Sequence, residues 1–292
     1  MSGQRMAAVD IGTNSCRLLI ADKKGKSIIP VLKTLRTTRI GEGLAREGLL
    51  GEKPIGRTIT ALKEYLALIR EFEVVHLRVV ATSAVREAAN AAFFLDQARN
   101  ETGLAIDIIS GREEAYLTYI GACQSIAAEG TAVVIDIGGG STEFTYSIQD
   151  ELSCYSIPLG AVRLTEEPCL LSEILGTAKE ILNRIKKIPC PVLIGVGGTI
   201  TSLAAVDLAL EVYEAERIQG HILTRKGVER IMFSLAVKNN EERKSVLGLQ
   251  PERADIIVAG TTILWSILTY LNAPGVRVSD ADLLYGIIQE MI

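Results

Sequence analysis

Hydrophobic and polar residues alternate along the chain with two periods, and these divide it into expected strands and helices. Short apolar runs rich in β-branched residues indicate buried strands, whereas apolar positions three or four residues apart indicate helices. The expected strands cover residues 6–9, 17–21, 27–32, 77–81, 106–109, 132–135, 143–148, 152–157, 192–196 and 276–278. The expected helices cover residues 54–72, 84–101, 111–126, 172–187, 199–209, 226–237, 251–271 and a last segment from residue 281. This order predicts an α/β fold.

One strand and turn occur twice in the sequence. Residues 10–18 read DIGTNSCRL and residues 136–144 read DIGGGSTEF, with Asp, Ile, Gly and Ser at the same offsets. Each motif follows an apolar strand and leads into an expected β-hairpin, so the repeat predicts a duplicated α/β domain. We expect an N-terminal domain over residues 1–124 and a C-terminal domain over residues 125–292.

Composition and charge exclude several classes of function. The 292 residues include 31 Lys and Arg against 35 Asp and Glu, without a basic block, and a single Trp with five Phe. These counts argue against a nucleic-acid-binding face. Two histidines exclude a multi-histidine metal site, and five scattered cysteines without a CxxC argue against a zinc site or a disulfide framework.

The chain also carries no pattern typical of a membrane protein. The uncharged stretch 256–273 contains Thr, Ser, Tyr and Asn side chains, which favours a buried core helix over a membrane span. Asp10 interrupts the first apolar run, so we expect no signal peptide. Together with the scattered cysteines, this predicts a cytoplasmic protein without membrane or nucleic-acid partners.

The duplicated DxG motif is the strongest chemical signal. A strand that ends in Asp, followed by a tight turn of Gly with Ser or Thr, directs several backbone N–H groups toward one point and can bind phosphate. Asp10 and Asp136 stand where a carboxylate can hold hydrated Mg²⁺ against phosphate oxygens. A single DxG is more often an ordinary turn, but two related copies favour a phosphate site.

A third glycine cluster, GVGGT at residues 195–199, connects an expected strand to an expected helix, with Thr199 available as the N-cap. It has two interpretations. The glycines allow the helix to pack closely on its strand, or the loop adds a phosphate or nucleotide contact at a helix N-terminus.

The expected helix from Gly111 offers a candidate catalyst. Ser110 and Glu113 have the spacing of a capping box, which accounts for Glu113 but not for Glu114. Glu114 is either a solvated partner of the helix dipole or a carboxylate that orients or deprotonates water. Arg86 and Asn90 lie one turn apart on the expected helix 84–101, where Arg86 either contacts phosphate or forms a salt bridge.

These motifs resemble the exopolyphosphatase and guanosine pentaphosphate phosphohydrolase family of the actin-like ATPase superfamily, in its short two-domain form. The matching strings, in order, are DIGTNSCRL at 10–18, ATSAVREAAN at 81–90, SGREEA at 110–115, DIGGGSTE at 136–143, GVGGT at 195–199 and ERADIIVAG at 252–260. The resemblance implies two actin-like, ribonuclease H-like domains with the active site in the cleft between them. Asp282 stands where the family pattern has glycine.

The resemblance also implies a role for each matching residue. Glu114 activates the attacking water, and Asp136 and Glu143 hold Mg²⁺ or Mn²⁺. The residues expected to contact phosphate are Asn14, Ser15, Arg17, Arg86, Gly138, Gly139, Gly140, Ser141, Thr142, Gly198 and Thr199. The expected activity is release of terminal orthophosphate from inorganic polyphosphate, guanosine pentaphosphate or both.

Two other functions use the same motifs. A phosphotransferase of the superfamily also has two DxG turns and a glycine loop, and a non-catalytic module can bind nucleotide and switch conformation. The formation of ADP from ATP and an acceptor would indicate the first, and nucleotide-dependent assembly without turnover the second. The sequence leaves the oligomeric state open, with a homodimer as one option.

Overall fold

The computed structural model describes residues 4–25, 27–126, 130–149 and 151–291. The chain forms two compact units. The first extends to Gly121 and takes in the chain again from Leu283, and the second comprises Ala122–Asp282. The expected C-terminal domain ran to residue 292, whereas the last helix packs with the first unit.

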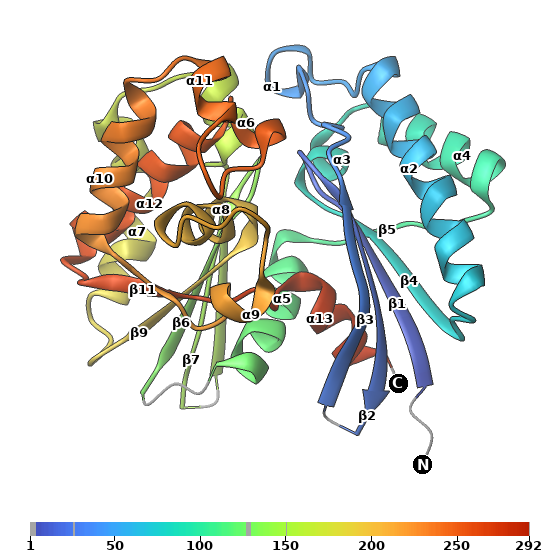
Figure 1. The fold of residues 1–292 in the computed structure, drawn as a ribbon, viewed down its shortest axis with the longest axis horizontal. Coiled ribbons are helices and arrows are strands. Elements are labelled where there is room, and N and C mark those ends of the chain that lie inside the picture. The colour runs from blue at the N-terminus through green and yellow to red at the C-terminus, as the bar shows by residue number, and fades with distance from the viewer. Residues whose placement is uncertain (1–3, 26, 127–129, 150, 292) are drawn as a thin grey trace. The chain divides into compact units, whose positions relative to one another are not determined.

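The first unit contains a five-stranded sheet in the order β3-β2-β1-β4-β5 (Figure 1). Its strands are β1 (Gln4–Ile11), β2 (Cys16–Lys24), β3 (Ser27–Arg36), β4 (His76–Ala81) and β5 (Asp107–Ile108). The first three form an antiparallel meander, and β1, β4 and β5 run parallel. The carboxyl ends of β1, β4 and β5 therefore share one edge of this sheet.

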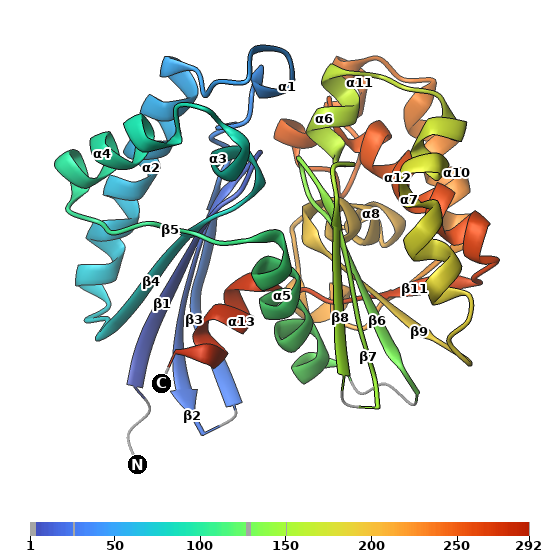
Figure 2. The ribbon, with the colours of Figure 1, turned by 180° about the vertical axis from the view of Figure 1, so that it is seen from behind.

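Helices cover both faces of the first sheet. They are α1 (Leu44–Glu47), α2 (Glu52–Glu71), α3 (Ser83–Glu87), α4 (Ala91–Thr102), α5 (Gly111–Ser125) and α13 (Leu283–Glu290). Side chains alternate between the faces of a strand, so Ala7 and Val9 pack in a cluster with α2 and α4, whereas Met6 and Ala8 pack in another with α5 and α13. Figure 2 shows these two helix layers on either side of the strands.

A close approach of two helices holds α13 in the first unit. A Cβ atom at Gly286 would lie 1.8 Å from the carbonyl oxygen of Leu117 on α5. Only glycine permits this distance between the two backbones. Leu284 and Ile287 of α13 are fully buried in the same cluster as Leu117.

The second unit contains a six-stranded sheet in the order β10-β11-β9-β6-β7-β8. Its strands are β6 (Ala132–Ile137), β7 (Thr142–Ile148), β8 (Glu151–Ile157), β9 (Val192–Val196), β10 (Ile222–Thr224) and β11 (Gly275–Val278). Its helices are α6 (Ala161–Glu166), α7 (Leu171–Ile185), α8 (Gly197–Asp207), α9 (Ala215–Ile218), α10 (Arg225–Ala236), α11 (Asn240–Lys244), the 3₁₀ turn η1 (Pro251–Arg253) and α12 (Ile257–Leu271). Strands β6, β7, β9 and β11 share one apolar core with α7, α8, α10 and α12. The α/β prediction is confirmed.

One expected helix is interrupted. The periodicity predicted a single helix over residues 84–101, but α3 ends at Glu87 and Ala88 is extended, with φ −73° and ψ 130°. Asn90 lies at the start of α4, where its amide donates to the carbonyl of Leu50 at 2.9 Å and accepts from the Leu50 N–H at 2.8 Å. The expectation that Arg86 and Asn90 share a helix face is therefore wrong, because these hydrogen bonds hold the chain outside a helical path.

The uncharged stretch 256–273 forms α12, whose buried residues include Ile263 and Leu264 in the core of the second unit. None of the helices that the structure describes is both long enough and apolar enough to cross a lipid bilayer.

Candidate active site

The two DxG turns have the same backbone geometry. The Gly12 N–H donates to the Ser15 carbonyl at 3.0 Å, and the Gly138 N–H donates to the Ser141 carbonyl at 3.0 Å. Each turn joins two antiparallel strands, β1 to β2 in the first unit and β6 to β7 in the second. The sequence repeat is therefore also a repeat of local structure.

The residue opposite the motif Asp differs between the two copies. Asp10 pairs in register with Arg17, whose guanidinium lies 2.6 Å from its carboxylate. Asp136 pairs in register with Glu143. Directly opposite residues of an antiparallel pair share a face, so one turn carries an ion pair and the other carries two carboxylates.

The glycine turn of the second unit is held from one side. Its carbonyls point toward the start of α6, because Gly138 O accepts from Ala161 N–H at 2.9 Å, Gly139 O from Val162 N–H at 2.8 Å, and Gly140 O from the Arg163 guanidinium at 3.0 Å. In a trans peptide the N–H points opposite to the carbonyl. The N–H groups of Gly139, Gly140 and Ser141 therefore point away from α6, the arrangement that a phosphate-binding turn requires.

The two carboxylates of the second turn fit a hard divalent cation. Glu143 is 2% exposed, and one of its oxygens accepts from the Ser156 hydroxyl at 2.7 Å. Within the described part of the chain, no three His, Cys, Asp or Glu side chains are placed to hold a metal ion. If a divalent cation binds at this turn, Asp136 and Glu143 would supply two oxygen ligands, and water and phosphate oxygens would complete the shell, as is usual for Mg²⁺.

The third glycine cluster lies directly beside Asp136. Gly197 has φ +87°, and a Cβ atom there would lie 2.3 Å from the Asp136 carboxylate. Helix α8 already begins at Gly197, so Thr199 lies inside the first turn and is not the N-cap. The Thr199 side chain packs instead against Gly260 of α12, where a Cβ atom would lie 2.5 Å from its methyl group.

Sequence reasoning missed Arg253 as a residue of this region. Its guanidinium would lie 2.2 Å from a Cβ atom on Gly198, and the residue is 9% exposed. The guanidinium therefore occupies the space that a side chain at residue 198 would fill. The ERAD string at 252–255 marked the segment in the sequence, but no spacing rule connects it to residue 198, 55 positions earlier.

In the first unit, Glu114 is a buried carboxylate held by Arg86. Glu114 is 8% exposed, and its carboxylate accepts from the Arg86 guanidinium at 3.0 Å. Burial raises the pKa of Glu114 to about 7, against the opposing effect of Arg86, and Asp10 and Arg17 are also near enough to act on it. A carboxyl that titrates near neutral pH is suited to act as a general base.

Several residues expected to contact phosphate have protein partners in the structure. Arg17 binds Asp10, and Arg86 binds Glu114 and the Ile109 carbonyl. The buried Thr142 hydroxyl donates to the Leu159 carbonyl and so supports the turn. Asn14 and Ser15 are both buried in the first turn, with the Asn14 amide 3.3 Å from the Ser15 hydroxyl oxygen.

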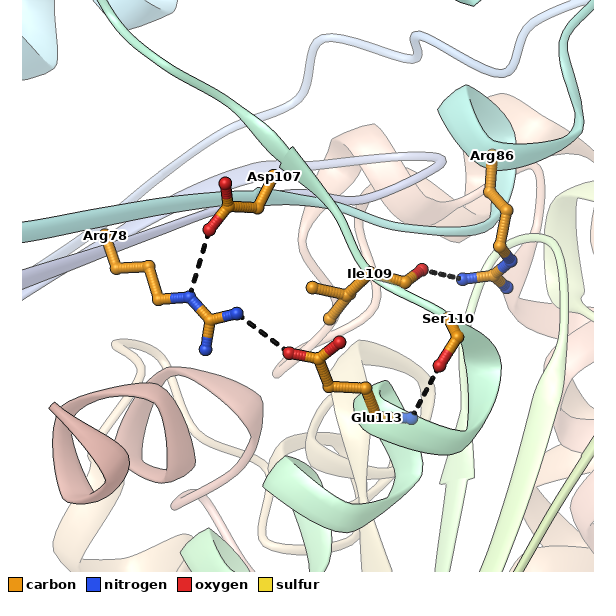
Figure 3. A network of polar contacts seen from close by, with 6 residues as sticks. All are labelled: Arg78, Arg86, Asp107, Ile109, Ser110 and Glu113. Atoms are coloured by element: carbon orange, nitrogen blue, oxygen red, sulfur yellow. Dashed lines mark hydrogen bonds and ion pairs between the residues drawn. The ribbon is translucent and has the colours of Figure 1, made fainter.

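The expected capping box at the start of α5 forms only in part. The Glu113 N–H donates to the Ser110 hydroxyl at 3.1 Å, but the Glu113 carboxylate accepts from Arg78 of β4 at 2.8 Å (Figure 3). Glu113 and Glu114 therefore have different partners, Arg78 and Arg86, and the Glu113 carboxylate does not bind the backbone as a full capping box would require.

Two α/β units, each with a DxG turn between two antiparallel strands, have the architecture that the sequence predicted for the actin-like class. Over residues 19–292 the chain matches the Ppx/GppA phosphatase family. The chain belongs to this family, which confirms the resemblance found in the sequence.

Relatives of known sequence and structure agree with this assignment. The chain is 36% identical to a bifunctional 3-dehydroquinate synthase/phosphatase of Fusobacterium nucleatum, with 97% of the chain aligned but only 46% of that protein covered. It is 31% identical to exopolyphosphatase 2 of Mycobacterium tuberculosis, over 98% of each protein. The crystal structure of the Aquifex aeolicus Ppx/GppA family member matches with a TM-score of 0.80 and 32% identity, over 98% of this chain and 96% of that one.

Proposed function

We propose that the protein hydrolyses terminal phosphoanhydride bonds and releases orthophosphate from inorganic polyphosphate, from guanosine pentaphosphate or from both. The observation that carries the proposal is Glu114, a buried carboxyl with a pKa of about 7 that is held by Arg86. The family and the exopolyphosphatase relative support the class of reaction.

In the proposed step, Glu114 accepts a proton from water while the water oxygen attacks the terminal phosphorus. The bond from that phosphorus to the bridging oxygen breaks, and the shortened chain leaves with the electron pair. The N–H groups of Gly139, Gly140 and Ser141 bind phosphate oxygens of the substrate. A divalent cation held by Asp136 and Glu143 would supply positive charge to neutralise those oxygens.

Measurement of orthophosphate release from polyphosphate and from guanosine pentaphosphate, side by side, tests the proposal. We expect release from at least one substrate without any acceptor, and loss of release in Glu114→Gln. Formation of ADP from ATP and an acceptor, without release from either substrate, would show a phosphotransferase instead.

A further inference from the structure

The segment that carries Glu114 has few backbone bonds to the sheet. Strand β5 contains only Asp107 and Ile108, which pair with Val80 and Ala81 of β4. One further bond joins the Ile109 N–H to the Ala81 carbonyl at 3.1 Å. The chain then turns directly into α5. The position of the first helical turn therefore depends largely on side-chain contacts.

Two arginines hold this segment from opposite sides (Figure 3). On one side, Arg78 of β4 donates to Asp107 at 3.2 Å and to Glu113 at 2.8 Å. On the other side, Arg86 donates to the Ile109 carbonyl at 3.0 Å and to Glu114 at 3.0 Å. Arg78 thus joins the strand before the turn to the helix after it.

A guanidinium is a rigid plane with donors in fixed directions. One Arg78 group that binds both Asp107 and Glu113 therefore sets the separation between the end of β5 and the first turn of α5. The contacts are partly exposed, with Arg78 at 28%, Glu113 at 41% and Asp107 at 59% side-chain exposure. Exposed ion pairs contribute little to overall stability, so loss of Arg78 should leave the fold intact, and a change in kcat would then report on the position of the first turn of α5.

We propose that Arg78 is a positioning residue for catalysis, acting through Asp107 and Glu113 to hold the first turn of α5 and with it the Glu114 carboxylate. The inference rests on the proposed function of Glu114. Arg78 touches neither the substrate nor Glu114 in this account. Its loss would leave Arg86 as the single arginine that holds the segment.

Substitution of Arg78 by Met tests the proposal in the full-length protein. We expect kcat for orthophosphate release to fall about 10-fold with KM within a factor of two, because a displacement of an ångström or less at a catalytic group is costly. Arg78→Lys keeps the positive charge but loses the planar guanidinium that binds two carboxylates at once. Its kcat should therefore lie between those of the wild type and Arg78→Met. The matched control is Arg5→Met, which breaks a comparably exposed pair with Asp22 in the same sheet and should leave kcat unchanged.

A second variant keeps the arginine and removes both of its partners. Asp107→Ala with Glu113→Ala leaves Arg78 no side-chain acceptor on the segment and should reproduce the loss of kcat in Arg78→Met. Each single substitution leaves one contact and most of the activity. This double variant also carries the test if Arg78→Met does not fold. A rise in KM with kcat unchanged would overturn the proposal, since Arg78 would then bind substrate.

Two further readouts separate positioning from a merely structural role. Hydrogen exchange in a peptide that covers the first turn of α5 should be faster in Arg78→Met and unchanged in Arg5→Met, independently of any activity. The acid limb of the kcat profile should move to higher pH, because Glu114 would lose part of its contact with Arg86 while Asp10 and Arg17 stay in place. Faster exchange with wild-type kcat and pH profile would refute positioning. If the wild type releases no phosphate from any substrate, the proposed function fails. Hydrogen exchange would still show whether the contacts of Arg78 with Asp107 and Glu113 hold the first turn of α5.

Discussion

The Arg86 guanidinium lies 3.0 Å from the Glu114 carboxylate, yet burial keeps the pKa of that carboxyl at about 7. The arginine favours the charged form and desolvation opposes it. A carboxylate with this balance is ionised in a large fraction of molecules at neutral pH and is still basic enough to accept a proton from water.

Substitution of Glu114 by Gln should lower kcat by about 10² to 10⁴, the usual contribution of a general base, with little change in Tm. Glu113→Gln is the matched control one residue away. It weakens a partly exposed contact with Arg78, which costs less than about 1 kcal/mol of stability, and should retain most activity. Steady-state kinetics and thermal unfolding of both variants check this division. An equal loss of activity in the two variants would contradict it.

The pKa of Glu114 also predicts the pH dependence of turnover. The base must be deprotonated, so kcat should fall as the pH drops below about 7. In Arg86→Gln the cation that favours the charged form is gone, which should raise the pKa and move the acid limb to higher pH. Arg36→Gln, which breaks an exposed ion pair with Glu64, is the control. In this variant the acid limb of the kcat profile should stay at the wild-type pH. A limb that moves to lower pH in Arg86→Gln would show that this account of the pair is wrong.

The two carboxylates of the second DxG turn, Asp136 and Glu143, predict a requirement for a divalent cation. Chelation should abolish activity, Mg²⁺ or Mn²⁺ should restore it, and Asp136→Asn should be nearly inactive with or without metal. Independently of turnover, Mg²⁺ or Mn²⁺ should raise the Tm of the wild type but not of Asp136→Asn. Asp207→Asn is the control, because Asp207 belongs to the same unit but binds His221 and Arg230. Full hydrolysis of polyphosphate by chelator-treated protein would refute the requirement.

The turns could be predicted from the sequence because their information is local. The DxG repeat places Asp10 opposite Arg17 and Asp136 opposite Glu143 at the same spacing of seven residues, and both turns form as the repeat implies. A strand, a tight turn and a return strand depend on residues that are neighbours in the sequence, so a single sequence is enough to predict them.

Contacts between distant segments could not be predicted in this way. The break before α4 depends on hydrogen bonds between Asn90 and Leu50, 40 residues apart. The Glu113 carboxylate binds Arg78, 35 residues earlier, rather than its capping partner. Helix periodicity describes how a segment packs, but it carries no information about which polar groups meet once the sheet has formed.

The charge of the chain predicts how a long substrate is digested. Processive cleavage of a polyanion needs an extended basic track, because each phosphate that stays bound between cycles requires a neutralising partner. The sequence has 31 Lys and Arg against 35 Asp and Glu and no long basic run, and Arg17 and Arg86 are paired with carboxylates. Binding should therefore involve a few phosphates, weaken as salt screens them, and stop improving beyond a short chain length. Gel electrophoresis of partly digested long polyphosphate should show a gradually shortening ladder, the mark of distributive release. Full-length substrate together with free phosphate and no intermediates would instead show processive cleavage.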